Sequence, residues 1–254
     1  MSEIRGLSKK DDYRKQLAAL DAWDEFLLKE SGLPGPRGNI ELAKAVAEAG
    51  DITLFQRYLA FDAQKAPTNS PYEFLAFCGV VGMGRLLAEG QPEVLPVIRR
   101  AANDPRWRMR EGTAMALQCW GRADMIALLQ EMSLWCSGSL LEQRAAVASI
   151  CEPDLLRDAS YAEPVFQILD TVTTSLKTMT GRGGEDFQAL RKGLGYCWSV
   201  AVTAFPEVGK FRMELWFNDA DKDVLWVMRE NLKKKRLERL DPAWVDAATD
   251  QLIG

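Results

Sequence analysis

Residues 103–121 read NDPRWRMREGTAMALQCWG, a stretch with a helix start, an inner face and a helix stop. Asn103 or Asp104 can accept a backbone N–H as the helix N-cap, and Pro105 suits the first helical turn. Gly121 suits the left-handed turn that commonly ends a helix. The stretch therefore predicts one helix that begins near Pro105 and ends at Gly121.

One face of this predicted helix is apolar. Met109, Ala116 and Trp120 fall on a single stripe at helical spacing. The small residues at positions 112, 114 and 116 would let another helix approach closely. Because such a helix cannot bury its own apolar face, we expect it to pack against similar helices.

Similar helical patterns follow one another along the chain, mostly as pairs joined by short turns. No segment shows the two-residue alternation typical of strands, so the fold class is predicted to be all-α. We expect an N-terminal helical cap and loop over residues 1–38 and one continuous helical array over residues 39–254. The predicted helices span 11–30, 39–50, 51–59, 72–89, 92–102, 103–121, 123–135, 139–151, 164–178, 185–205, 206–217, 221–239 and 242–254.

Three glycines interrupt the apolar helix 72–89, at positions 79, 82 and 84. Their Gly-x-x-Gly-x-Gly spacing resembles a phosphate-binding loop, but no strand pattern precedes them and no Lys-Ser/Thr pair follows. We therefore expect these glycines to serve close helix packing.

Composition excludes several kinds of chemistry. The 254-residue chain has no histidine, which removes any Ser–His or Cys–His nucleophile and the commonest zinc ligand. A formal net charge of −4 argues against a general nucleic-acid binder. No cofactor and no metal are expected. The five cysteines lie mostly inside apolar helical patterns with no Cys-x-x-Cys pair, so we expect buried, reduced thiols.

Two features bear on location. The first residues, Met1–Arg5, are polar and resemble no signal peptide. The longest apolar run, Phe74–Met83, is about half of the ~20 residues that a membrane-spanning helix needs. We expect a cytoplasmic protein without a membrane segment.

Arginines recur at matching places in the second helices of the predicted pairs. Arg110, Arg144, Arg191 and Arg229 lie one to two turns into their helices, at intervals of 34, 47 and 38 residues. Periods of this length are typical of stacked helical hairpins.

Two segments resemble the turn and second helix of a HEAT repeat: residues 104–117 (DPRWRMREGTAMAL) and 218–232 (NDADKDVLWVMRENL). The resemblance covers residues 39–240 and implies a right-handed α-α superhelix. It also implies that a turn aspartate, here Asp104 and Asp221 or Asp223, pairs with an arginine, often in the neighbouring repeat. HEAT arrays host many roles, so the resemblance leaves the activity open.

The first functional hypothesis is a non-enzymatic binding or scaffold protein that presents a concave helical groove to a protein or another extended partner. The alternative interpretations are structural: the arginines form ion pairs within the fold, the tryptophans pack in apolar contacts, and residues 233–236 are a solvated helix end. The candidate groove residues are Trp107, Arg108, Arg110, Arg144, Arg191, Lys192, Trp226, Arg229 and Lys233.

The second hypothesis is a nucleic-acid-binding relative of the HEAT-like glycosylases that repair alkylated DNA. Their catalytic aspartate follows a tryptophan by four residues, and Trp120 and Asp124 have this spacing. Gly121 is expected to break the helix between Trp120 and Asp124, so Asp124 is interpreted more simply as a residue that opens the next helix.

Overall fold

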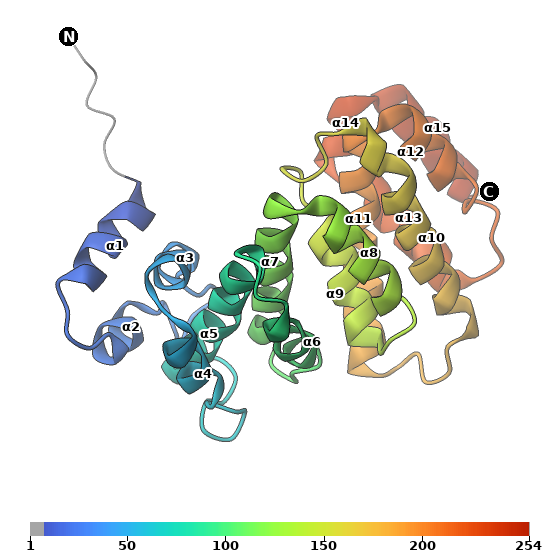
Figure 1. Cartoon of the computed structure of the whole chain (residues 1–254). Coiled ribbons are helices and arrows are strands. Elements are labelled where there is room, and N and C mark those ends of the chain that lie inside the picture. The colour runs from blue at the N-terminus through green and yellow to red at the C-terminus, as the bar shows by residue number, and fades with distance from the viewer. Residues whose placement is uncertain (1–7, 254) are drawn as a thin grey trace, which may run out of the picture. The chain divides into compact units, whose positions relative to one another are not determined.

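A computed structural model describes residues 8–253, which form fifteen α-helices and two short 3-10 helices with no strand among them (Figure 1). The all-α prediction is therefore confirmed. The polar start Met1–Arg5 lies outside the described residues. No helix within residues 8–253 combines the length and the apolar character that crossing a bilayer requires.

Contacts divide the chain into two compact units, residues 1–123 and 124–254. In the described part of the first unit, α1, α3, α5 and α7 pack in succession, each on the next, and α2, α4 and α6 flank α5 and α7. The helices of this unit are α1 (Lys9–Ala18), α2 (Asp24–Glu30), α3 (Ile40–Ala49), α4 (Ile52–Leu59), α5 (Pro71–Ala88), α6 (Leu95–Ala102) and α7 (Trp107–Ala123), with the 3-10 helix η1 (Pro92–Val94) before α6.

The second unit repeats the scheme, because α9, α11, α13 and α15 pack in succession while α8, α10 and α12 lie against them. Alternate helices therefore form the contact row in both units. The helices are α8 (Met125–Trp135), α9 (Leu140–Ile150), α10 (Ala162–Thr178), α11 (Glu185–Ala204), α12 (Pro206–Glu214), α13 (Lys222–Leu232), α14 (Lys235–Leu240) and α15 (Pro242–Ile253), with the 3-10 helix η2 (Ala159–Tyr161) before α10.

Helix α5 is the centre of the first unit, and all of its residues from 73 to 84 are buried, whichever face of the helix they lie on. Glycine makes this possible, since a Cβ added at Gly84 would lie 2.3 Å from the Cα of Ala116 on α7. A Cβ at Gly82 would meet the ring of Phe55 on α4 at 2.4 Å, and one at Gly112 would meet Val80 at 2.6 Å. The interpretation of the glycines as helix-packing residues is confirmed.

Several predicted helix limits are wrong. Helix α7 begins at Trp107, because Asp104 Oδ1 accepts the N–H of Arg106 and forms a turn before the helix. It also continues through Gly121 to Ala123, since a glycine inside a packed helix is tolerated.

Two segments predicted as single helices are each divided. The helix expected over residues 11–30 becomes α1 and α2, and the one expected over 221–239 becomes α13 and α14. In the first case the indole N–H of Trp23 donates to the carbonyl of Leu17 at 3.0 Å and folds the chain back. The expected thiols are confirmed: all five cysteines are free, and four of them are buried.

We predict that Gly84→Ala lowers the free energy of unfolding by about 2 kcal/mol, because α5 and α7 must separate to admit the methyl group. Urea unfolding followed by circular dichroism measures the effect. The matched control is Gly193→Ala, also inside a helix, where the nearest atom to an added Cβ is Arg144 Cγ at 3.4 Å. This variant should be neutral or more stable by up to about 1 kcal/mol. Equal effects of the two changes would contradict the packing argument.

Candidate binding groove

The candidate residues of the first unit serve its own structure. Arg108 is only 3% exposed: it donates to the carbonyl of Gly35 at 2.6 Å and lies 3.4 Å from a carboxylate oxygen of Glu73. Its guanidinium also covers the ring of Trp107 at 4.3 Å. Arg110 donates to two backbone carbonyls of the turn before its own helix, at 2.8 and 3.0 Å. The charge of Arg108 is therefore used inside the fold.

Sequence reasoning missed Arg106, which is equally buried. Its guanidinium forms two hydrogen bonds to the carboxylate of Asp104 and donates to the carbonyls of Phe61 at 3.0 Å and Ala66 at 3.1 Å. Asp104 therefore pairs with this neighbour, while it meets Arg110 only through its backbone. The signal in the sequence was the Asp-Pro-Arg turn, where the side chains of positions 104 and 106 lie on the same side.

Two candidates of the second unit, Arg191 and Trp226, do meet. Arg191 stacks on the ring of Trp226 at 4.3 Å and pairs with Asp223 Oδ1 at 2.5 Å. A pairing of Asp221 or Asp223 with an arginine was expected, and Asp223 forms such a pair with Arg191. The two residues border a depression of about 460 Å³, but Asp223 lies in its lining and neutralises part of its positive charge.

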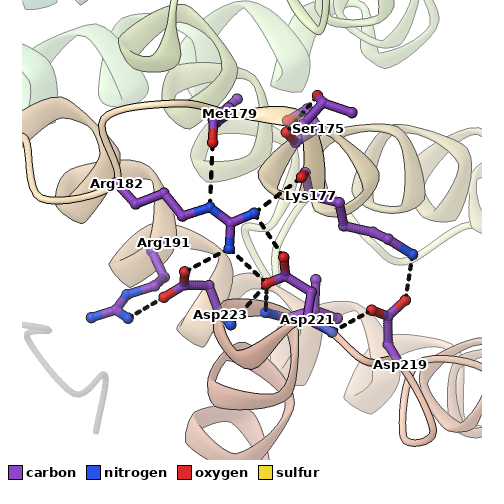
Figure 2. A network of polar contacts seen from close by, with 10 residues as sticks. Ser175, Lys177, Met179, Arg182, Arg191, Asp219, Asp221 and Asp223 are labelled. Atoms are coloured by element: carbon purple, nitrogen blue, oxygen red, sulfur yellow. Dashed lines mark hydrogen bonds and ion pairs between the residues drawn. The ribbon is translucent and has the colours of Figure 1, made fainter.

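Figure 2 shows that Asp223 and its neighbour Asp221 also hold the glycine-rich linker before α11. Arg182 pairs with Asp221 at 2.7 Å and with Asp223 at 3.0 Å, and it donates to the carbonyls of Lys177 and Met179. Burial raises the pKa of Asp221, but hydrogen bonds from Arg182 and from two backbone amides outweigh burial and hold that pKa below its usual value. The network fastens α10, the linker and α13 to one another.

The remaining candidates are dispersed. Arg229 donates to the carbonyl of Leu252 at 2.6 Å and so holds α15. Arg144 lies with its Cγ close to Gly193 of α11, while Lys192 is exposed. Lys233 is exposed and pairs with Glu230 at 2.5 Å. Of these four residues, Lys233 lines the groove that is described next.

That groove is a basic hollow of about 720 Å³ at the junction of α13 and α14. The junction exists because the N–H of Lys234 bonds to the carbonyl of Asn231 and Lys234 itself is extended. The chain then turns back, and Leu237 becomes fully buried. Lysines and arginines that a continuous helix would distribute around its axis are brought to one hollow. Its lining consists of Pro153, Leu156, Val200, Thr203, Ala204, Lys233, Lys234, Lys235, Arg236 and Arg239.

Half of these lining residues carry a positive charge and none is acidic. Arg236 stacks on the ring of Tyr196 at 4.5 Å and bonds to its hydroxyl. Within residues 8–253, Lys234, Lys235 and Arg239 enter no ion pair. The opposite wall is apolar, with Leu156 and Val200 almost completely buried. The groove therefore offers uncompensated positive charge beside an apolar surface.

A buried asparagine fixes the position of this groove. Asn231, in the last turn of α13, accepts the backbone N–H of Ser199 at 2.8 Å and donates to the carbonyls of Leu194 and Val227. Its amide thus bonds directly to the backbone of α11, the helix that carries Val200 and Thr203. Sequence reasoning missed Asn231, and an asparagine inside an apolar helical pattern was the signal.

Neither a metal centre nor a cysteine nucleophile is evident in residues 8–253. No group of three or more His, Cys, Asp or Glu side chains there could hold a metal ion. Burial raises the pKa of Cys136 to about 11 and also raises the pKa of Cys78, Cys119 and Cys151, which keeps these thiols protonated. Asp124 is the N-cap of α8, where its carboxylate accepts the N–H of Ala127 at 2.9 Å.

Comparison with known proteins returned no match to a family model, to a curated protein or to a solved structure.

We predict that Asn231→Ala destabilises the protein by about 2–3 kcal/mol, because the buried amide of Ser199 loses its acceptor. Urea unfolding is the measurement, and Asn218→Ala, at an exposed position, is the control that should change little. An unchanged unfolding midpoint for Asn231→Ala would show that the amide does not hold α13 against α11.

The lowered pKa of Asp221 leads to a pH-dependent prediction. A carboxylate whose pKa is lower in the folded state contributes stability above its unfolded pKa of ~3.9, and this contribution is lost as the pH falls through the folded value. Asp221→Asn should therefore cost about 1–2 kcal/mol at pH 7 and progressively less below about pH 4. Urea unfolding of both proteins from pH 7 to pH 3 tests this. The exposed Asp246→Asn should show no such trend, and a cost for Asp221→Asn that is the same at every pH would refute the assignment.

Proposed function

We propose that this chain is a non-enzymatic binding protein built from HEAT-like helical hairpins, and that its basic groove takes an acidic segment of a partner protein. The proposal includes a right-handed superhelical array of the hairpins and a cytoplasmic location. The packing of alternate helices within each unit supports the repeat interpretation, because second helices of consecutive hairpins contact each other in such arrays.

The observation that carries the proposal is that one hollow contains both cations without an ion-pair partner and an apolar wall. The cations of the groove would attract carboxylates, and Leu156, Val200 and Ala204 would receive an apolar side chain of the same segment. A peptide supplies both kinds of group at short spacing, whereas a phosphate backbone supplies only charge.

Nucleic acid is the alternative partner, and the groove favours it less. Its lining contains no aromatic side chain on which a base could stack. The chain is acidic overall, which opposes association with a long polyanion at low salt. Capping of α8 by Asp124 also leaves that carboxylate engaged, which weakens the glycosylase interpretation.

The test is fluorescence anisotropy with a labelled twelve-residue peptide of glutamate, aspartate and leucine, beside the same peptide with Gln and Asn in place of the acids. We expect the acidic peptide alone to bind, with affinity that falls as salt increases. The double variant Lys234→Glu/Lys235→Glu should bind at least about tenfold more weakly, a loss of ~1.4 kcal/mol.

The matched control is Lys29→Glu/Lys192→Glu, which changes the net charge equally at exposed positions outside the groove. It should bind as the unmodified protein does. No binding of the acidic peptide, or an equal loss in both double variants, would refute the proposal. If a labelled DNA duplex bound more tightly than the acidic peptide, and only Lys234→Glu/Lys235→Glu abolished that binding, nucleic acid would be the ligand of the groove.

A further inference from the structure

Arg236 differs from the other cations of the basic groove, because an aromatic side chain holds its guanidinium in place. Its Cζ lies 4.5 Å from the centre of the Tyr196 ring, and one of its N–H groups donates to the Tyr196 hydroxyl. Arg236 is half-buried, whereas Lys233, Lys235 and Arg239 are exposed. A planar guanidinium that is held at its face and at one N–H keeps a fixed orientation, while an ammonium group on a flexible exposed stem does not.

The donors that this contact does not use are available to a ligand. In the part of the chain that the structure describes, Arg236 enters no ion pair, and its side chain makes no hydrogen bond besides the one to Tyr196. Its remaining side-chain nitrogens are accessible in the hollow that Arg236 lines. The Tyr196 hydroxyl accepts from Arg236, and its own hydrogen donates to no described residue. A guanidinium and a hydroxyl that meet with donors to spare suit a carboxylate, which accepts through two oxygens.

The fold fixes where this pair lies relative to the apolar wall of the groove. Tyr196 is on α11, four residues before Val200 of the wall, and residues four apart are neighbours on one helical face at about 6 Å. Arg236 reaches Tyr196 because the chain turns back at Lys234 and buries Leu237. A carboxylate bound by Arg236 would therefore lie at a set distance from an apolar side chain on the wall.

We propose that Arg236, positioned by Tyr196, binds one particular carboxylate of the acidic segment, at a fixed place relative to the apolar side chain that the wall receives. The inference rests on the function proposed above and names the feature that the groove selects in its partner. The exposed charges of Lys233, Lys235 and Arg239 attract the segment as a whole, because such charges act over a distance and favour no single position. Arg236 instead fixes the register of the segment.

A position scan of the ligand tests this. The parent is a labelled twelve-residue peptide of glutamates with one internal leucine, which sets the register on the wall, and in each derivative one glutamate becomes glutamine. Fluorescence anisotropy at one salt concentration gives the affinities. We expect one derivative to bind at least about tenfold more weakly than the parent, since it loses a charge-assisted hydrogen bond. Each of the others should lose about threefold or less, as exposed ion pairs do.

Variants of the arginines separate a positioned guanidinium from charge alone. Arg236→Lys keeps the charge but loses the planar fork, so it should bind the parent at least about tenfold more weakly and show no dominant position in the scan. Arg239→Lys is the matched control, because it makes the same exchange at an exposed arginine of the same groove. It should leave both the affinity and the dominant position unchanged.

Variants of Tyr196 test its role as a positioning residue. Tyr196→Leu removes the ring and the hydroxyl and should abolish the dominant position. Tyr196→Phe keeps the ring, so it should retain that position and bind the parent about threefold more weakly. Tyr196 is 46% exposed, and equal urea-unfolding midpoints of the variants would show that the fold is kept.

The outcomes distinguish this inference from the function on which it rests. If the parent peptide binds and every derivative loses the same affinity, the inference fails and the acidic partner stands. If the parent peptide does not bind at all, both fail. A dominant position that survives in Arg236→Lys or in Tyr196→Leu would overturn the inference, and so would an equal effect of Arg236→Lys and Arg239→Lys.

Discussion

Close contact between alternate helices is the constraint on which both units depend. A helix that packs between two other helices needs small side chains on the faces that contact them. The chain has glycine and alanine at such positions. Gly84 lies against the backbone of Ala116, and Gly195 lies against the ring of Trp226 with 3.1 Å left for a Cβ. The contacts of both units therefore depend on glycine and alanine in the middle of helices, where helix propensity alone would disfavour glycine.

Polar groups complete these contacts by fixing the position of one element on another. Arg106 and Arg108 fasten loops of the first unit to the start of α7, and Arg182 fastens a glycine-rich linker to the start of α13. Arg106 and Arg108 are buried and therefore expensive to desolvate, and the carboxylates and carbonyls that they contact offset that cost. An arginine close to the start of a helix can therefore serve to attach a loop as well as to bind a ligand.

Sequence reasoning found what local pattern determines. Apolar periodicity fixes where most helices lie, and the caps Asn39 and Asp51 each accept an N–H of the helix that follows them. It failed where tertiary contacts override propensity. Nothing in Lys233-Lys234 breaks a helix, yet the chain turns there because Leu237 gains a buried position and Asn231 holds the end of α13.

The candidate site shows the same contrast between features set by local sequence and features set by tertiary contacts. Arg191 and Trp226 were both listed as candidate residues, but their direct contact was not predicted from the sequence. The basic groove was only partly visible, as the run of four basic residues 233–236, for which a solvated helix end was the favoured interpretation. What distinguishes a groove from a helix end is the apolar wall opposite the charges, and Leu156 and Val200 come to that wall from helices and loops more than thirty residues away.

A second hollow of the same unit, a cleft of about 570 Å³ between α8 and α10, lies on other helices than the basic groove. When alternate helices pack on one another in succession, the intervening helices keep one face uncovered. The last helices of the succession also keep an uncovered end. The residues that line the cleft between α8 and α10 are uncharged, whereas the end of α13 concentrates cations that the negative end of its helix dipole favours. Because the lining residues of the two hollows do not overlap, a ligand bound in the basic groove would leave the cleft between α8 and α10 open.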